Sequence, residues 1–307
     1  MLLVSAGGYT RGSGSGYGCR DRWPLCEGGA LGGYLPRADS HMIVEWSHRW
    51  LAGVVVLLIL LTVLAAWRGR CGRGVAVPAA VALVVVSVQA YLGRLVVAHR
   101  LDADLVSLHL TMAMVVIALL ATTLVHALPR PDAGAAELRP PDRVWVGLLS
   151  AGALATLAVL VLGSLVHNEY VGGWPLVDGR FIPGFAEHVV VVHSLHRVVA
   201  AAGTVLVAAL AVASVRRQRP RAERSLVFVA LACYAGNVAL GAAHVATQVR
   251  SSAIVVAHLT VASLAWTSLV LATLLARRCR AARPGPHDPQ QYVGPGLLAH
   301  NRTRSTR

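Results

Sequence analysis

The chain has 307 residues, of which 56% are apolar and 14% charged, and its mean hydropathy is +0.61. These values exclude an ordinary water-soluble domain, in which about 25% of the residues are charged. The net charge of +14 would suit a nucleic-acid-binding protein. The basic residues are all Arg, however, and they are neither gathered on one helix face nor interleaved with aromatic residues, so no nucleic-acid partner is predicted.

The chain opens on Met1-Leu-Leu-Val-Ser-Ala, which has no basic region and too few apolar residues for a signal peptide. Seven longer apolar stretches follow, each of roughly 22 to 27 residues and long enough to cross about 30 Å of hydrocarbon as a helix. They cover residues 43–67, 75–98, 105–128, 144–166, 189–215, 226–249 and 253–276. We therefore predict an all-α polytopic membrane protein.

The Arg residues are divided unevenly between the two sets of loops. Fifteen follow the first, third, fifth and seventh stretches, and seven lie on the opposite side. The positive-inside rule then predicts a multi-pass protein of the plasma membrane with a cytoplasmic C-terminus. Because seven spans would leave the start of the chain outside, we expect a first helix that is missing or truncated, with Gly7 and Gly8 at its outer end.

An internal repeat divides the chain, because four landmarks recur after about 148 residues. The offset is 148 for Ser47-His48-Arg49 with Leu195-His196-Arg197 and for Leu92-Gly93 with Leu240-Gly241, 149 for His109-Leu110-Thr111 with His258-Leu259-Thr260, and 151 for Trp23-Pro24-Leu25 with Trp174-Pro175-Leu176. The repeat predicts two pseudo-symmetric four-helix bundles, related by an axis along the membrane normal.

The predicted halves are residues 1–128, comprising an outer loop and a bundle that lacks its first helix, and residues 144–282. Between them, the Pro-rich and charged residues 129–143 are predicted to form a cytoplasmic linker. Residues 283–307 are predicted to be a disordered cytoplasmic tail.

Four of the thirteen histidines occupy repeat-equivalent positions, namely His48, His109, His196 and His258. All four fall near the outer ends of predicted helices, two in each bundle, where they would face one another across the interior and ligate a heme. Zinc fits less well, because the members of each pair lie on separate helices about 60 residues apart. Packed core histidines are the alternative.

Three arginines are candidates for pairing with heme propionates. Arg49 and Arg197 directly follow two of the candidate ligands, and the alternative is that they snorkel to the interface. Arg94 lies inside the second apolar stretch, where a charge needs a partner.

The halves differ next to one histidine. Glu45 lies three residues before His48 on the same helix face, whereas the repeat-equivalent position holds His193. The difference predicts acid–base chemistry by Glu45 in the first half and electron storage and transfer in the second. The alternative is that Glu45 is an ordinary interfacial carboxylate stabilised by the helix dipole.

The five cysteines separate by predicted compartment. Cys19 and Cys26 lie together in the outer loop, where a structural disulfide is expected and a redox role is the alternative. Cys71 and Cys279 on the cytoplasmic side and Cys233 within a helix are expected to be reduced.

Several of these motifs together resemble the heme A synthase family. The likeness covers about residues 7 to 277 and rests on Thr10-Arg11-Gly12-Ser13-Gly14-Ser15-Gly16 before Cys19, Trp23-Pro24-Leu25-Cys26, Glu45-Trp46-Ser47-His48-Arg49, Leu108-His109-Leu110, Leu195-His196-Arg197 and Ala257-His258-Leu259. The resemblance implies eight helices in two bundles and an oxidoreductase that converts the C8 methyl of heme O to a formyl, giving heme A for terminal oxidases.

The resemblance also implies roles for single residues. The first bundle would bind the substrate heme O through His48 and His109, with Glu45 catalytic. The second bundle would hold a heme b cofactor through His196 and His258. Cys19 and Cys26 would form a disulfide.

Two other functions remain alternatives. A di-heme electron carrier acting on membrane quinol would use the same paired histidines but would need neither Glu45 nor the cysteine loop. A heme transporter or chaperone would release an unmodified heme. If the protein is a heme A synthase, its candidate partners are a heme O synthase and further copies of this chain. The sequence does not identify its membrane electron donor.

Overall fold

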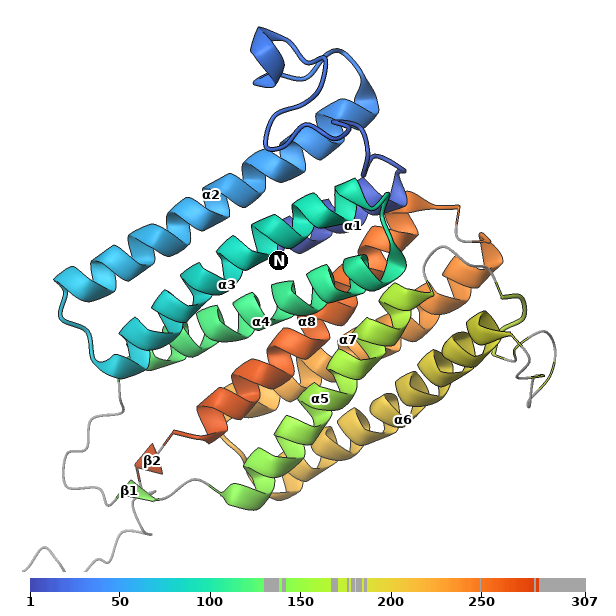
Figure 1. Cartoon of the computed structure of the whole chain (residues 1–307). Coiled ribbons are helices and arrows are strands. Elements are labelled where there is room, and N and C mark those ends of the chain that lie inside the picture. Colours follow the sequence, from blue (N-terminus) through green and yellow to red (C-terminus); the bar gives the residue numbers. More distant parts are fainter. Residues whose placement is uncertain are drawn as a thin grey trace, which may run out of the picture.

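In a computed structural model, the chain is described for residues 1–129, 138–139, 142–166, 171–175, 177, 180, 184, 187–248, 250–278 and 280–281. The helices in these residues are α1 (Leu2–Gly12), the 3-10 helix η1 (Leu31–Gly33), α2 (Ser40–Arg68), α3 (Arg73–Ala98), α4 (Ala103–Ala127), α5 (Arg143–Leu165), α6 (His188–Arg216), α7 (Arg221–Ala246) and α8 (Ser252–Ala276). Figure 1 shows their arrangement. Helices α2 to α8 are long and apolar enough to cross a membrane, which confirms a multi-pass α-helical protein.

Most helix ends lie within three residues of the predicted ones, and two differ more informatively. Helix α7 begins at Arg221, five residues before the predicted apolar stretch, because its first turn is polar and follows Pro220, whose extended backbone ends the preceding turn. Helix α1 runs on to Gly12, so the prediction that Gly7 and Gly8 form a helix end was wrong. Both glycines lie inside the helix, where they pack closely against His48 and Leu259 respectively.

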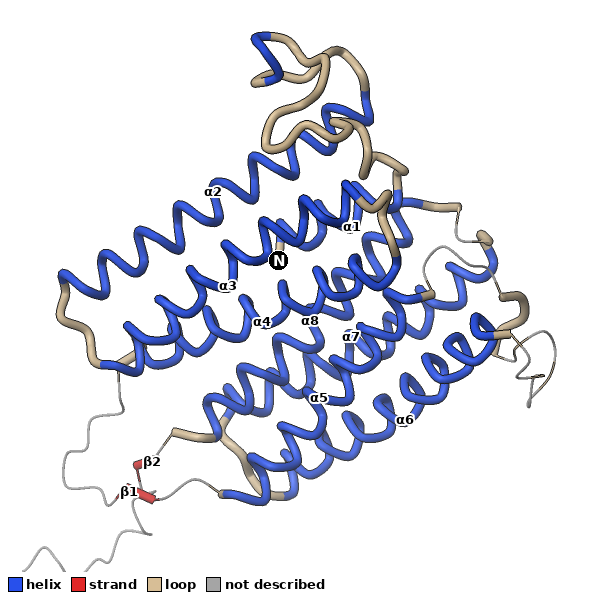
Figure 2. The backbone as a smooth tube through the Cα atoms, in the orientation of Figure 1, coloured by secondary structure: helices blue, strands red, loops and turns tan. Residues whose placement is uncertain are grey.

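The second half is a closed four-helix bundle. Helices α5, α6, α7 and α8 each pack on the next, and α8 also packs on α5. In the first half, α1 packs on α2, α2 on α3 and α3 on α4. The halves meet where α4 contacts α5 and α8 and where α1 lies against α8 (Figures 1 and 2).

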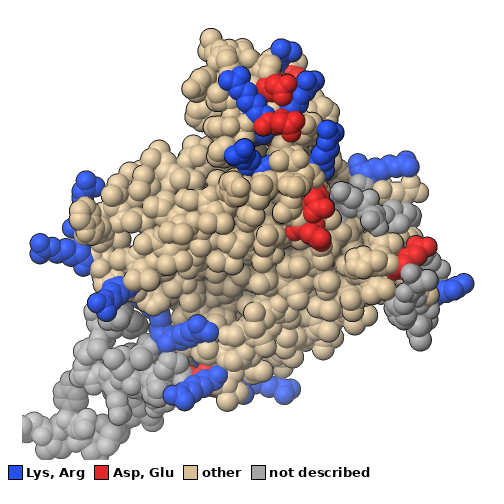
Figure 3. Space-filling model, viewed as in Figure 1, with Lys and Arg blue, Asp and Glu red and all other residues tan. Residues whose placement is uncertain are grey.

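The two ends of the bundle carry the charged residues. On the face drawn in Figure 3, Arg, Asp and Glu gather toward the ends and the middle is almost free of them, as a membrane requires. Residues 13–39, the first loop, lie at what we call the disulfide end, and the opposite end is called the Arg-rich end. The strands β1 (Leu138–Arg139) and β2 (Arg280–Ala281) form a two-residue antiparallel pair.

The predicted division of the chain stays a prediction. Most of the linker 129–143 and the whole tail 283–307 lie outside the described residues, as does Cys279. The contacts between β1 and β2 join a part of this linker to the residues that follow α8.

A buried charged cluster ties the second bundle together at the Arg-rich end. Glu223 on α7 is 2% exposed and accepts hydrogen bonds from Trp145 Nε1 of α5 at 2.9 Å and from Arg219 Nε at 3.1 Å. Arg219 Nη1 also contacts Asp142 Oδ2 at 3.2 Å, and the guanidinium lies 5.1 Å from the Trp145 ring centroid. These bonds connect α5, α7 and the turn that follows α6.

Asp142 begins α5, since its side chain accepts from the backbone N–H of Trp145 at 3.1 Å. That bond, followed by the charges of Arg219 and Arg217, holds the pKa of Asp142 below its usual value. A lowered carboxyl pKa contributes stability that is present at neutral pH and is lost as the pH falls through the pKa of the folded state, below about 4.

Replacing Glu223 tests the importance of the cluster. In Glu223→Gln, Trp145 keeps an acceptor but the buried Arg219 loses its closest charge partner, so unfolding should become easier by about 3 kcal/mol. The thermal transition in detergent, followed by circular dichroism, should shift down by several degrees. Arg221→Gln, at an exposed position two residues earlier, should leave it unchanged. Equal transitions for both variants would contradict the structural importance of the cluster.

Candidate functional site

The four repeat-equivalent histidines occupy matched places in the two halves. His48 and His196 are the ninth residues of α2 and α6, and His109 and His258 are the seventh residues of α4 and α8. In each half the two histidines therefore lie on alternate helices, within about the first two and a half turns of each. The predicted placement near the starts of these helices agrees with the structure.

Each histidine ring lies against a glycine of a neighbouring helix. A Cβ added to Gly163 on α5 would lie 2.9 Å from Cε1 of His196, and one added to Gly7 on α1 would lie 3.1 Å from Cε1 of His48. For Gly93 with His109 and Gly241 with His258, the corresponding distances are 3.2 and 3.6 Å. The sequence pattern Leu-Gly had marked the last two glycines as repeated, but not their contact with the rings.

Two side-chain amides, which sequence reasoning missed, support the helices of the second histidine in each half. Gln89 Nε2 on α3 donates to the carbonyl of His109 at 2.8 Å. In the amide orientation that satisfies both of its side-chain atoms, Asn237 on α7 donates to the carbonyl of His258 at 3.2 Å and accepts from the backbone N–H of Ala262 at 3.0 Å. Their positions differ by 148, the offset of the repeat, and this was the signal that could have found them.

A cavity of about 390 Å³ opens between the helices of the second half. His196 and His258 line it from two alternate helices, and His193 and His244 line it as well. The rings of His244 and His258 lie nearly parallel, with centroids 6.2 Å apart. The remaining walls are largely aliphatic, as is usual for a small-molecule site.

The nitrogen atoms around this cavity suit a heme. Nδ1 of His196 lies 3.1 Å from the carbonyl oxygen of Val159, and because that oxygen only accepts, Nδ1 carries the proton and Nε2 is free to ligate iron. Nδ1 of His258 is buried with no hydrogen-bond partner within the described residues. The same residues contain no group of three or more His, Cys, Asp or Glu that would hold a bare metal ion. Two imidazoles and apolar walls fit a planar tetrapyrrole better.

In the first half, His48 and His109 are also half-buried, and each has a buried Nδ1 without a partner in the described part of the chain. These two orphaned nitrogens make the pair a candidate for ligand binding, like the pair in the second half. The geometry of the histidine pairs is thus repeated, while their neighbours differ.

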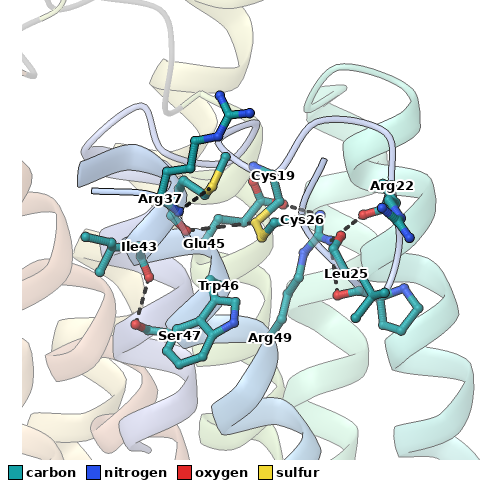
Figure 4. Close-up of a disulfide and its surroundings, with 12 residues drawn as sticks. Cys19, Arg22, Leu25, Cys26, Arg37, Ile43, Glu45, Trp46, Ser47 and Arg49 are labelled. Carbon is teal, nitrogen blue, oxygen red and sulfur yellow. Dashed lines mark hydrogen bonds and ion pairs between the residues drawn. A yellow bond between two sulfur atoms is a disulfide. The ribbon is translucent and has the colours of Figure 1, made fainter. Parts of the chain in front are cut away.

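Glu45 connects α2 to the first loop, as Figure 4 shows. It is 3% exposed, accepts from the backbone N–H of Cys19 at 2.7 Å, and forms an ion pair with Arg49. Cys19 is joined to Cys26 by a disulfide, which confirms that expectation. The carboxylate therefore lies where the disulfide loop reaches the helix that carries His48.

Arg49 and Arg197 hold the loops in equivalent ways. Arg49 Nη1 donates to the carbonyls of Arg22 at 2.9 Å and Leu25 at 3.0 Å. Arg197 donates to the carbonyls of Gly173 at 2.8 Å and Val171 at 3.2 Å. Their predicted pairing with propionates stays a prediction. The contacts described are with loop backbone and, for Arg49, also with the Glu45 carboxylate.

Arg94, the third candidate for a propionate contact, lies exposed on α3. Arg94 directly follows Gly93 in the sequence, and Gly93 is the glycine that lies against the His109 ring. The structure brings it into no ion pair with the described residues, and its predicted role stays a prediction.

Residues 1–270 match the family of cytochrome oxidase assembly proteins called COX15-CtaA. The chain is 26% identical over 295 residues to the heme A synthase of Shouchella clausii, with 92% of this chain and 94% of that protein covered. It is 26% identical over 292 residues to the heme A synthase of Halalkalibacterium halodurans, with the same coverage. A shorter match of 118 residues to the heme A synthase of Bacillus pumilus is 31% identical and covers 38% of this chain.

The contacts of Arg49 predict the behaviour of the first loop under proteolysis. In Arg49→Gln the carbonyl of Arg22, which trypsin must attack, loses its hydrogen bond, and the loop is freed from α2. Cleavage after Arg22 should become several-fold faster, as measured by mass spectrometry of timed digests. Arg68→Gln, at the opposite end of α2, should cleave like the parent protein. If the parent loop is cut as fast as the variant loop, Arg49 does not hold it.

Proposed function

Because the chain belongs to the COX15-CtaA family of cytochrome oxidase assembly proteins, we propose that it is a heme A synthase that oxidises the C8 methyl of heme O to a formyl group. The observation that carries the proposal is the family match over nearly the whole chain, together with a histidine pair at the same place in each half. A di-heme electron carrier is not favoured, since the relatives are named heme A synthases.

The second half is the proposed cofactor site. His196 and His258 line its cavity and are the residues that would hold a heme b. Bound there, heme b supplies one-electron storage and transfer. Val159 orients His196 by accepting from its Nδ1, and Asn237 supports the helix that carries His258. The largely aliphatic walls would keep water away from a heme bound there.

The first half is the proposed substrate site, with His48 and His109 as ligands of heme O. Two successive hydroxylations of the methyl group give a hydrated aldehyde, which loses water to form the formyl group. Written with water as the source of oxygen, the net change releases four electrons and four protons. The four electrons would have to pass one at a time through the second half to an oxidant outside this chain, and the four protons need an acceptor near the methyl group.

Glu45 is the proposed acid–base residue, since it is the buried carboxylate one helical turn from His48. The repeat-equivalent residue of the second half is His193, which lines the cofactor cavity. The two halves therefore share ligand geometry and differ in the group beside the ligand. This difference supports separate roles for substrate and cofactor.

The proposed orientation places the disulfide end outside and the Arg-rich end, with the C-terminus, in the cytoplasm of a cell with this protein in its plasma membrane. The fifteen-to-seven division of Arg between the loops supports it. Heme O synthase is the proposed supplier of substrate.

Heme extraction after co-expression tests the reaction. With heme O synthase, in a host that makes no heme A, membranes containing this chain should yield heme A by chromatography. Glu45→Gln should lower the yield by about a hundredfold or more while heme O stays bound. Glu27→Gln, an exposed carboxylate of the same loop, is the matched control and should keep the parent yield. Only heme B and heme O from a heme-loaded parent protein would refute the proposal.

Ligand substitutions test which half holds the cofactor. His196→Ala should remove the low-spin absorption of heme b from the purified protein, because one axial ligand is lost. His48→Ala should leave that absorption in place and remove bound heme O. The readouts are the reduced-minus-oxidised spectrum and the extracted hemes. Loss of heme b in His48→Ala with retention in His196→Ala would reverse the assignment of the halves.

A further inference from the structure

Arg11, in the last turn of α1, belongs to the first half by sequence but lines the cavity of the second half. Its Nη1 donates to the carbonyl of Ser164 on α5 at 3.3 Å. Ser164 also lines this cavity. A guanidinium from one half thus reaches the site that the other half builds around His196 and His258.

Close packing between α1 and α8 fixes Arg11 in this place. Gly8 and Gly12, one helical turn apart, face α8: a Cβ added to Gly8 would lie 2.8 Å from Leu259 Cδ2, and one added to Gly12 would lie 3.2 Å from Val255 Cγ1. Ser252 Oγ donates to the carbonyl of Gly12 at 2.7 Å. Such small-xxx-small spacing lets two membrane helices approach closely. These contacts on both sides fix the backbone position of Arg11 against α8.

Arg11 still has donors to offer. Its Nε and Nη2 are buried and have no hydrogen-bond partner among the residues that the structure describes. Buried N–H groups without an acceptor are costly, and more so when they are charged. Arg197, the other guanidinium at this cavity, already donates from Nη1 and Nη2 to the carbonyls of Gly173 and Val171. Arg11 is therefore suited to bind an anion inside the cavity.

We propose that Arg11 binds a propionate carboxylate of the heme held between His196 and His258. The two unpartnered N–H positions match the planar geometry of a carboxylate, and the charges are opposite. The inference rests on the proposed function, because it takes the cavity to be the heme b site. It makes α1 a part of that site, so that heme binding and the docking of α1 on α8 stabilise each other.

The first test separates binding from structure. Arg11→Gln is prepared in a His48→Ala background, so that only the heme of the second half is observed. The control is Arg20→Gln in the same background, at an exposed position of the first loop. Heme transfer to apomyoglobin should be about tenfold faster for Arg11→Gln and unchanged for Arg20→Gln. The heme-depleted Arg11→Gln protein should unfold at the same temperature as its parent or higher, because a buried cation without a partner is gone. Lower stability of both forms would overturn the proposal, since it indicates a structural role alone.

The second test identifies the propionate. The heme-depleted protein is reconstituted with iron protoporphyrin IX or with its dimethyl ester. The parent should hold the ester more weakly than the acid, whereas Arg11→Gln should hold both alike. An equal preference for the acid in both proteins would overturn the proposal.

The histidine variants keep this inference apart from the proposed function. If His196→Ala loses the heme while Arg11→Gln behaves like its parent, only the role of Arg11 fails. If His196→Ala and His258→Ala both retain the heme, the proposed cofactor site itself fails, and the role of Arg11 with it.

Discussion

The interior of a membrane bundle offers no water to a polar group, so each nitrogen of a buried imidazole needs a partner within the protein or a ligand. The rest of the site follows from this constraint. One nitrogen of His196 is satisfied by the carbonyl of Val159, which leaves the other for a ligand. Gly163 leaves space for the imidazole ring of His196, and both residues line the cavity. His258, whose Nδ1 has no described partner, faces the same cavity.

The repeat uses one scaffold for two tasks. Arg49 and Arg197 fasten the loops to α2 and α6 through backbone carbonyls, and Gln89 and Asn237 contact the helices of His109 and His258. Against this shared framework, Glu45 and His193 stand out as unlike residues at one position. Glu45 binds the disulfide loop, whereas His193 lines a cavity. Substrate chemistry in one half and electron transfer in the other are what such a difference would serve.

Much of the fold could be predicted from sequence, because a membrane span is a long apolar run and leaves a strong signal. The histidine pairs could be predicted because they are rare residues at a fixed offset. Gln89 and Asn237 were missed although they recur at the repeat offset of 148, since an amide in an apolar helix does not show which carbonyl it faces. The contacts of Arg49 with the first loop could not be predicted, because sequence does not show which of several acceptors a guanidinium reaches. Arg11 was overlooked because its partners lie on α5 and α8, far along the chain.

The central claim is that the two halves hold different hemes, and heme stoichiometry tests it most directly. The chain is purified from a host that makes heme O but no heme A, and its hemes are extracted, separated and counted per polypeptide. We expect one heme b and one heme of the O or A type for each chain. Two hemes b per chain, with neither heme O nor heme A, would contradict it.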